Sequence, residues 1–446
     1  MTIIERMAEA GIVGIGGAGF PTHAKYKKDI EYLIVNAAEC EPLLQTDQYA
    51  MNNQATEIII ALEMIKKELE IEHVVIATKA DYKEEVAALE AVIATLNSSV
   101  TIHQMENYYP TGDEFVTVYE VTGRVVPPAG LPLMVGCLVS NVSTVLNIYY
   151  AITERKPVTT KRLTVTGQVV SPTLLEVPIG TPLDVCLNAA GGTSLERYLF
   201  LNGGPMMGGL HTQDDLGKQV VTKTTSGLIV IEEKGYLREL KNQTLDEIIS
   251  KTELACIQCS LCTDLCPRQK MGHDVFPHKV MNYFAQKENR KSVTDNDVLR
   301  GSLLCSSCGV CEVIACPRGL SPRQVNNYVK EEFAKQGIRY ENEKAEFDVD
   351  PLRECKTVTA TNILMKTGML EFGGHKLDTI KVIDVDEVFI PLDMHIGAPA
   401  TPMVRTGDFI KVGDLIAKPE GLGANIHASI SGKVVTINHH IHIKKQ

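Results

Sequence analysis

The sequence contains no tryptophan, and aromatic residues make up only 5% of its 446 positions. No stretch approaches the roughly 18 consecutive apolar residues that a membrane-spanning helix needs. An excess of positive charge is also missing, because the formal net charge is −11. The sequence therefore argues against a transmembrane segment, and against nucleic acid or an anionic membrane surface as a direct partner.

A secretory leader is also not indicated at the start of the sequence. Residues 1–10 lack an apolar core and include Glu5 and Glu9, so we expect a cytoplasmic location. The hydrophobic fraction of 44% and the charged fraction of 22% are typical of globular proteins. A chain of this length predicts several domains.

Eight of the twelve cysteines gather in two runs, each followed by a proline. The runs are Cys256-x2-Cys259-x2-Cys262-x3-Cys266-Pro267 and Cys305-x2-Cys308-x2-Cys311-x4-Cys316-Pro317. In the bacterial ferredoxin pattern, three cysteines of a run hold one [4Fe-4S] cluster and the fourth reaches the other cluster. We therefore predict one cluster on Cys256, Cys259, Cys262 and Cys316, and a second on Cys305, Cys308, Cys311 and Cys266.

Zinc sites and disulfides are the alternatives for these cysteines. Structural zinc favours two CxxC pairs separated by a longer loop, and disulfides need an oxidising compartment, so both fit less well. The extra residue before Cys316 departs from the strict ferredoxin spacing. Four residues beside the ligands are expected to offer backbone N–H groups to cluster sulfurs: Gln258, Ser260, Ser307 and Gly309. Eight cysteines satisfy two clusters, so we expect His273 and His278 to lie on the surface or behind the ligands.

The first third of the sequence alternates between strand and helix patterns. Short apolar runs at residues 33–35, 74–77 and 100–102 predict strands. Residues 54–69 and 83–96 have the apolar spacing of helices. This alternation predicts a doubly wound, mainly parallel α/β sheet.

A glycine-rich loop precedes the first of these strands. Gly14, Gly16 and Gly19 satisfy G-x-G-x-x-G, but a dinucleotide fingerprint must follow a strand and open a helix. Here residues 3–10 have a helical pattern, and Phe20-Pro21 interrupts any helix that would follow. The loop can still offer backbone N–H groups to a phosphate or a flat ring, although a flexible surface loop is the alternative.

Four motifs in order resemble the NADH-binding, 51 kDa-type subunit family of respiratory complex I. They are residues 14–25 (GIGGAGFPTHAK), 36–42 (NAAECEP), 109–114 (YPTGDE) and 140–144 (SNVST). This resemblance implies FMN held between the glycine loop and the carboxyl ends of the strands, with NADH beside it. Two positions depart from the family pattern, because Ile15 replaces an arginine and Ala38 replaces an aspartate.

The resemblance also implies roles for individual residues. Gly14, Gly16 and Gly17 would pass close to the flavin, and Lys25 would neutralise its phosphate. Phe20 and Glu41 would face the nicotinamide nucleotide. The remaining implied flavin contacts are Asn36, Glu39, Tyr109, Gly112, Glu114, Asn141 and Thr144.

The motifs divide the sequence into four predicted domains. These are an FMN/NADH-binding α/β domain (1–155), a soluble ligand-binding β-grasp (SLBB) module (160–235), a helical two-[4Fe-4S] ferredoxin-like domain (245–335) and a β barrel-sandwich hybrid (385–446). We expect the β-grasp module to be a structural spacer. The barrel-sandwich lacks the modifiable lysine turn of lipoyl and biotinyl carriers, so no such group is predicted. His439, His440 and His442 are expected to form a solvated strand end, with metal binding as the alternative.

This domain order resembles the cobalamin reductases of propanediol-utilisation microcompartments. The resemblance implies NADH-dependent reduction of cobalamin from Co(III) to Co(II) and Co(I), with a corrinoid-handling protein such as an adenosyltransferase as partner. A location inside a bacterial microcompartment would follow. Three alternatives remain: an electron-input subunit for another reductase such as proline reductase, a subunit of the membrane ferredoxin:NAD oxidoreductase complex, and a ferredoxin-like relay without enzymatic activity.

Overall fold

Buried apolar strands of the first third form a four-stranded parallel sheet in the order β3-β2-β1-β4. The structure is a computed structural model, and it describes residues 1–17, 19–289, 292–342, 344 and 346–446. Ala18 of the glycine-rich loop therefore lies outside the described residues. The strands are β1 (Tyr32–Asn36), β2 (His73–Lys79), β3 (Thr101–Met105) and β4 (Cys137–Asn141).

Helices cover both faces of this sheet, as the predicted doubly wound fold requires. Successive strand residues point to opposite faces, so Leu33 packs toward α4 and α7, whereas Ile34 packs toward α6. The helices are α1 (Ile3–Glu9), α2 (Thr22–Lys25), α3 (Thr46–Asn53), α4 (Ala55–Leu69), α5 (Lys83–Leu96), α6 (Glu114–Thr122), η1 (Pro132–Val135) and α7 (Val142–Thr153). The carboxyl ends of β1 and β4 remain open between these layers, which is where open α/β sheets bind ligands.

The β-grasp module has a six-stranded sheet in the order β10-β6-β5-β9-β7-β8. Its elements are β5 (Thr160–Gly167), β6 (Thr173–Pro178), α8 (Leu183–Ala189), β7 (Tyr198–Asn202), β8 (Gly209–Thr212), η2 (Gln213–Lys218), β9 (Gly227–Glu232) and β10 (Ile380–Val382). The last strand, β10, follows the cysteine runs in sequence and pairs in parallel with β6. The chain therefore returns to this module, which its sequence pattern does not reveal.

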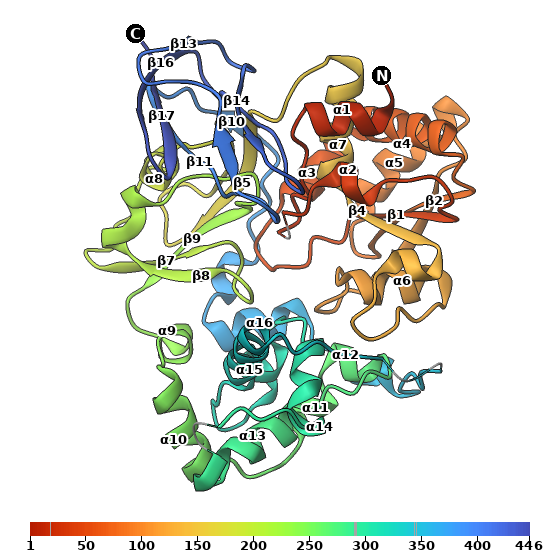
Figure 1. Cartoon of the computed structure of the whole chain (residues 1–446), viewed down its shortest axis with the longest axis vertical. Helices are drawn as coiled ribbons and strands as arrows, with labels where there is room; N and C mark the ends of the chain where they lie inside the picture. The colour runs from red at the N-terminus through yellow and green to blue at the C-terminus, as the bar shows by residue number, and fades with distance from the viewer. Residues whose placement is uncertain (18, 290–291, 343, 345) are drawn as a thin grey trace.

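The cysteine runs lie in a helical module at the bottom of Figure 1. Its helices are α9 (Tyr236–Lys241), α10 (Leu245–Ala255), α11 (Leu261–Asp264), α12 (Pro267–Lys270), α13 (Pro277–Ala285), η3 (Lys287–Asn289), α14 (Asp297–Arg300), η4 (Gly301–Leu304), η5 (Cys311–Ala315) and α15 (Pro322–Gln336). Ile248, Phe284 and Phe333 form its core, from α10, α13 and α15. The segment that follows contains η6 (Arg353–Cys355), α16 (Ala360–Thr367) and η7 (Leu370–Phe372).

The C-terminal barrel-sandwich consists of two small antiparallel sheets, β11-β17-β16-β13 and β12-β14-β15. Its strands are β11 (Glu387–Pro391), β12 (Ala400–Pro402), β13 (Phe409–Ile410), β14 (Leu415–Pro419), β15 (Ile426–His427), β16 (Gly432–Ile437) and β17 (His440–Lys444). Val388 and Ile441 share one continuous core with α1, α4 and α7 of the first domain. On β17, the ring of His442 stacks on the ring of Phe389 with centroids 4.3 Å apart, and its Nε2 lies 2.9 Å from the Glu387 carboxylate.

Two absences hold for the described ranges. None of the helices described there combines the length and the apolar character needed to cross a bilayer. No three His, Cys, Asp or Glu side chains in those ranges converge closely enough to hold a single metal ion.

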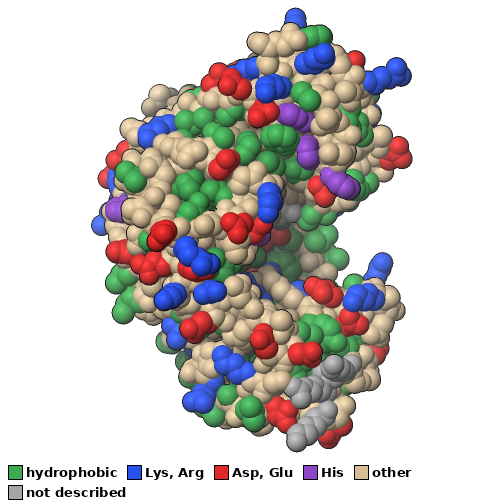
Figure 2. All heavy atoms as spheres, turned by 90° about the vertical axis from the view of Figure 1, so that its left-hand side faces the viewer, with side chains coloured by type: hydrophobic (Ala, Val, Ile, Leu, Met, Phe, Trp, Pro, Cys, Tyr) green, Lys and Arg blue, Asp and Glu red, His purple; other side chains and the backbone are tan. Residues whose placement is uncertain are grey.

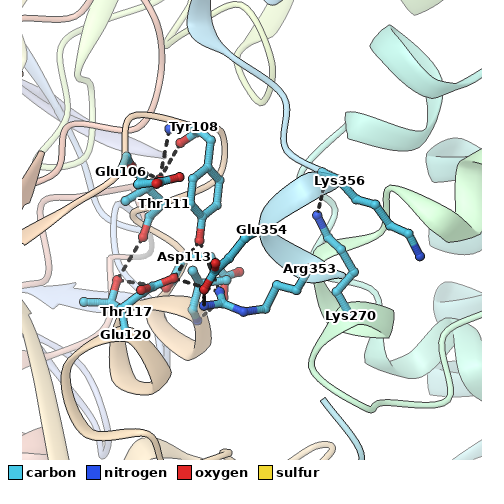
Figure 3. A network of polar contacts seen from close by, with 11 residues as sticks. Glu106, Tyr108, Thr111, Asp113, Thr117, Glu120, Lys270, Arg353, Glu354 and Lys356 are labelled. Carbon is cyan, nitrogen blue, oxygen red and sulfur yellow. Dashed lines mark hydrogen bonds and ion pairs between the residues drawn. The ribbon is translucent and has the colours of Figure 1, made fainter. Parts of the chain in front are cut away.

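Charged side chains of the ferredoxin module and of the segment that follows it contact the flavin domain (Figure 3). Arg353 of η6 donates to Glu120 at 2.7 Å and to the Tyr108 hydroxyl at 3.4 Å. Arg268 forms an ion pair with Asp113 at 3.0 Å and stacks on Phe115. Figure 2 shows a hollow between the ferredoxin module and the rest of the molecule, with acidic and basic side chains interspersed over that face.

Arg268→Ala is expected to lower the free energy of unfolding by about 3 kcal/mol, because it leaves the nearly buried Asp113 carboxylate unpaired. Urea denaturation of the holoprotein, followed by the visible absorption of the clusters, measures this. Arg300→Ala is the control, since Arg300 and Asp295 form an exposed pair and its loss should leave the midpoint unchanged. Equal effects of the two variants would contradict a structural role for the Arg268 pair.

Candidate functional site

A cavity of about 390 Å³ opens at the carboxyl ends of β1 and β4. A volume of this size is typical of small-molecule and cofactor sites. Seven of the thirteen predicted flavin and nucleotide residues line it: Gly16, Asn36, Glu39, Glu41, Tyr109, Gly112 and Asn141. The other six lie outside its wall: Gly14, Gly17, Phe20, Lys25, Glu114 and Thr144. The assignments of individual residues to the cofactor stay predictions.

Glycines let the backbone approach closely on two sides of this cavity. A Cβ at Gly16 would lie 3.3 Å from the Cβ of Asn141, and a Cβ at Gly112 would lie 2.8 Å from the Ala38 carbonyl oxygen. Thr144 fixes the loop from outside the wall, because its hydroxyl accepts a hydrogen bond from the Ile15 N–H at 3.1 Å. Asn141 caps α7 by accepting from the N–H of Ser143 at 2.9 Å. The cradle therefore suits a flat, polar cofactor such as FMN.

Lys25 and Glu114 form an ion pair beside the cavity rather than in its wall. The Lys25 ammonium lies 3.0 Å from the Glu114 carboxylate and donates a second, longer bond to the Val139 carbonyl at 3.4 Å. Both side chains are about one-third exposed. The predicted role of Lys25 at the FMN phosphate stays a prediction.

Two buried carboxylates, Glu39 and Asp47, line the cavity together. Glu39 accepts hydrogen bonds from the Thr46 N–H and hydroxyl, both at 2.9 Å, at the start of α3. Asp47 accepts from Asn141 Nδ2 at 2.7 Å and from the Ser143 hydroxyl at 2.6 Å. Burial, and then the neighbouring Asp47 charge, raise the pKa of Glu39 from its ordinary value of 4.5 to about 8. The pair therefore retains protons at a pH where isolated carboxyls are ionised.

Glu39→Gln is expected to flatten the pH dependence of stability. Because the folded pKa of Glu39 lies above its ordinary value, the folded state binds more protons between pH 4.5 and 8. The wild-type free energy of unfolding should therefore fall as pH rises through this window, by up to about 1.4 kcal/mol per pH unit. Denaturation of the flavin-free protein at several pH values measures the difference between the two proteins.

The other titratable groups that face Glu39 are present in both proteins, so this difference isolates its carboxyl. They are Asp47, Lys79, Tyr82 and Lys161. Parallel stability curves for wild type and variant would show that Glu39 is ionised throughout the window.

A chain of contacts links the cavity to the second cysteine run. The Glu41 carboxylate accepts hydrogen bonds from the N–H groups of Met206, at 2.9 Å, and Met207, at 2.7 Å, in the β-grasp module. The Met206 carbonyl accepts from Arg323 of α15 at 2.8 Å. Arg323 also lies 2.5 Å from Glu312, which is fully buried and follows Cys311 in sequence. Glu41 thus binds the β-grasp turn in this structure.

The β-grasp module supplies part of the cavity wall, so the prediction of a mere spacer is incomplete. Its contributions are Thr160, Lys161, Arg162, Glu176, Met207 and Ser226. Met207 lies in a glycine-rich turn whose sequence indicates only a loop. Ser143 lies within a recognised motif and Asp47 lies outside the motifs, so the polar character of Asp47 is the only local signal for its role.

Cys316 of the second run lies with the cysteines of the first run, and the assignment of cysteines to the two clusters stays a prediction. Cys256, Cys259, Cys262 and Cys316 surround one small cavity. Burial, and then the charges of Cys316, Cys256 and Cys259, raise the pKa of Cys262 to about 12. Burial and the nearby Cys266 and Cys305 likewise raise the pKa of Cys308 to about 12. Because iron binds thiolates, cluster assembly must remove these protons.

The two cysteine loops share one backbone conformation. Gln258 and Ser260 in the first loop, and Ser307 and Gly309 in the second, occupy equivalent positions and all have positive φ, from 53° to 83°. Such turns direct successive N–H groups inward, as anion-binding nests do. The Ser307 N–H lies 3.3 Å from Cys305 Sγ. Both loops therefore suit the sulfur-rich, negatively charged surface of a [4Fe-4S] cluster.

The extra residue before Cys316 is accommodated by a π-helical turn, η5 (Cys311–Ala315). A π turn takes one residue more than an α turn over a similar rise, and such turns occur frequently at functional sites. Cys316 is thereby brought beside Cys262, and its Sγ accepts from the Leu320 N–H at 3.3 Å. The extra residue therefore still leaves Cys316 beside the three cysteines of the first run.

Double cysteine variants test the crossed assignment. Cys256→Ser combined with Cys316→Ser should remove one cluster and leave about four irons per chain, because both ligate the same cluster. Cys256→Ser combined with Cys266→Ser should lower the occupancy of both clusters, and the iron content should fall well below four atoms per chain. Iron and acid-labile sulfide assays on anaerobically purified protein measure this. The reverse pattern would indicate that each run holds its own cluster.

The two histidines between the runs serve as structural side chains. His273 is buried, and its Nε2 lies 2.9 Å from the Val126 carbonyl, so the prediction of a surface position is wrong for it. The module needs this contact because it packs against the flavin domain there. His278 bonds to the Thr263 hydroxyl at 2.7 Å, behind the first cysteine loop.

Together, the fold and the site define a flavin iron–sulfur oxidoreductase with FMN and two [4Fe-4S] clusters as cofactors. Known domain families match in the same order: the Nuo51 FMN-binding domain over residues 7–150, the SLBB domain over 162–209, the 4Fe-4S dicluster domain over 255–321 and the RnfC barrel sandwich hybrid domain over 375–446. These matches confirm the predicted fold class.

Relatives that match nearly the whole chain identify the family within this class of oxidoreductases. The chain is 39% identical over 438 residues to the cobalamin reductase PduS of Salmonella typhimurium, covering 98% of this chain and 94% of that protein. It has the same identity and coverage with PduS of Citrobacter freundii. It is 29% identical over 296 residues to one component of the Na+-translocating ferredoxin:NAD+ oxidoreductase complex of Acetobacterium woodii, covering 65% and 63% of the two chains. The chain belongs to the family of the cobalamin reductase PduS.

Proposed function

We propose that this protein transfers electrons from NADH, through FMN and the two clusters, to a corrinoid. The observation that carries the proposal is that one cavity is lined both by Ile15 and Gly16 of the glycine loop and by Ser306 and Cys308 of the second cysteine run. The near-full-length similarity to cobalamin reductases supports a corrinoid as the acceptor. The similarity of residues 7–150 to an FMN-binding domain supports NADH as the donor.

Bound FMN supplies the exchange between a two-electron donor and one-electron acceptors. The residues of the chain bring this exchange close to the second cluster. Tyr109 lines the cavity, and its hydroxyl donates to the Cys308 carbonyl at 2.7 Å. The Glu41, Met206 and Arg323 contacts fix the same wall from the other side. Side chains therefore hold the distance between cofactors and need not act as acids or bases.

The first cysteine run is the more exposed of the two. Cys259 is exposed, whereas Cys311 of the second run is buried. Leu254 and Ile257 beside it are 87% and 62% exposed. We infer that electrons enter the cluster on Cys305, Cys308, Cys311 and Cys266, and leave through the cluster on Cys256, Cys259, Cys262 and Cys316.

The electron balance fits a corrinoid acceptor. Oxidation of one NADH to NAD+ and a proton releases two electrons, and these reduce Co(III) through Co(II) to Co(I). An adenosyltransferase is the kind of partner that would consume Co(I). The predicted domain boundaries, and a cytoplasmic location with or without enclosure in a microcompartment, stay predictions.

Anaerobic spectroscopy tests this function. Purified protein should contain flavin and about eight irons per chain, and NADH should bleach both chromophores. Added hydroxocobalamin should then be reduced, with the spectrum of Co(II) or Co(I) appearing as NADH is consumed. Failure of NADH to bleach the protein would favour a relay without NADH binding. Bleaching without reduction of hydroxocobalamin would favour an electron-input subunit for another reductase and overturn the corrinoid proposal.

A further inference from the structure

One buried cation in the cavity wall has no role in the site described above. Lys161, on β5 of the β-grasp module, is 7% exposed and lines the cavity. Its ammonium donates to the Ile15 carbonyl of the glycine loop at 3.3 Å. Within the described residues it forms no ion pair, whereas its neighbour Arg162 pairs with Glu176 at 2.8 Å. Lys161 therefore keeps hydrogen-bond donors that the protein does not use.

The groups around Lys161 restrict what it can bind. Burial lowers the pKa of Lys161 to about 8. The negative charges of Asp47 and Glu39 act in the opposite direction and raise this pKa. Both carboxylates accept hydrogen bonds, Glu39 from Thr46 and Asp47 from Asn141 and Ser143, and their oxygens keep further lone pairs that can accept. A phosphate dianion at this point would face two buried acidic groups. A neutral edge that combines carbonyl acceptors with an N–H donor would find a partner for each.

We propose that Lys161 is a flavin-binding residue supplied by the β-grasp module, and that it donates to the pyrimidine edge of the isoalloxazine ring. The proposal rests on the proposed FMN occupancy of this cavity. The pyrimidine edge carries two carbonyls and one N–H, which match the Lys161 donor beside the Glu39 and Asp47 acceptors. A hydride transferred to the ring leaves a negative charge there, and a nearby ammonium stabilises that charge in a site of low dielectric. Lys161 therefore favours the reduced form of the flavin over the oxidised form.

The first measurement is the flavin midpoint potential of the holoprotein, by spectroelectrochemical titration. Lys161→Gln should weaken the binding of reduced flavin, relative to that of oxidised flavin, by about tenfold. This change lowers the two-electron potential of the flavin by ~30 mV. Lys161→Arg, which keeps the charge, should restore most of the difference. Lys381→Gln, an exposed lysine on β10 of the same sheet, is the matched control and should leave the potential unchanged.

The second measurement separates the ring from the phosphate. The full chain, stripped of flavin with its clusters intact, is titrated with FMN and with riboflavin, and quenching of flavin fluorescence gives each Kd. Lys161→Gln should weaken both ligands by a similar factor, because both contain the ring. Weakening of FMN alone, with an unchanged potential, would assign Lys161 to the phosphate and overturn the proposal. An unchanged potential and unchanged affinities would overturn it as well.

Misfolding and failure of the proposed function have distinct signatures. A folded Lys161→Gln protein should keep about eight irons and the wild-type circular dichroism spectrum. If this variant does not fold, the comparison of Lys161→Arg with Lys161→Met in the same two measurements decides the role of the charge. If the wild-type protein binds neither FMN nor riboflavin, the proposed flavin site fails, whatever Lys161 does.

Discussion

The half-buried Glu41 carboxylate and the Arg323 guanidinium hold the same turn of the β-grasp module, and this turn joins the three modules on which electron transfer depends. Glu41 belongs to the flavin domain, and it holds the Met206-Met207 turn of the β-grasp module through two backbone N–H groups. Arg323 holds the same turn from the ferredoxin module, and it pairs with Glu312 beside Cys311. Removing one member would leave a buried charge unpaired, a change that typically costs about 3–5 kcal/mol. The separation between flavin cavity and second cluster is therefore fixed by a few strong, mutually dependent contacts.

Much of the fold is predictable from local patterns. Helix α5 has the predicted bounds of residues 83–96, because its apolar residues recur with the helical period and alternate with strands. The ligand runs were equally clear, since three cysteines at CxxCxxC spacing must lie on one tight loop. The π turn at η5 was not predicted, because only the packed structure shows how one extra residue is absorbed before Cys316.

Contacts between modules were the part that the sequence did not reveal. Lys161 lies near the start of β5, where an exposed lysine would be ordinary, and only the fold brings it beside Ile15, 146 residues earlier. His273 was expected on the surface or behind the ligands, and it is buried against Val126 of the flavin domain. Strand β10 is three residues long, and its pairing with β6 depends on a return of the chain from the ferredoxin module. Pairings between segments so far apart in the sequence leave no periodic pattern of residues from which they could be predicted.

The shared core of the barrel-sandwich and the flavin domain gives the glycine loop a rigid support. Ile396 donates its N–H to the Gly19 carbonyl at 2.9 Å, and Lys223 of the β-grasp module donates to the carbonyls of Gly11 and Asn425 at 2.6 Å. The barrel-sandwich thus binds the loop at Gly19, and the β-grasp module binds it through Lys161 at Ile15 and holds the residue Gly11 before it. Because a cofactor cradle must hold its shape without a ligand to order it, this support explains why a glycine-rich segment can form a defined wall. The accessory modules therefore act on the flavin site itself, in addition to connecting it to the clusters.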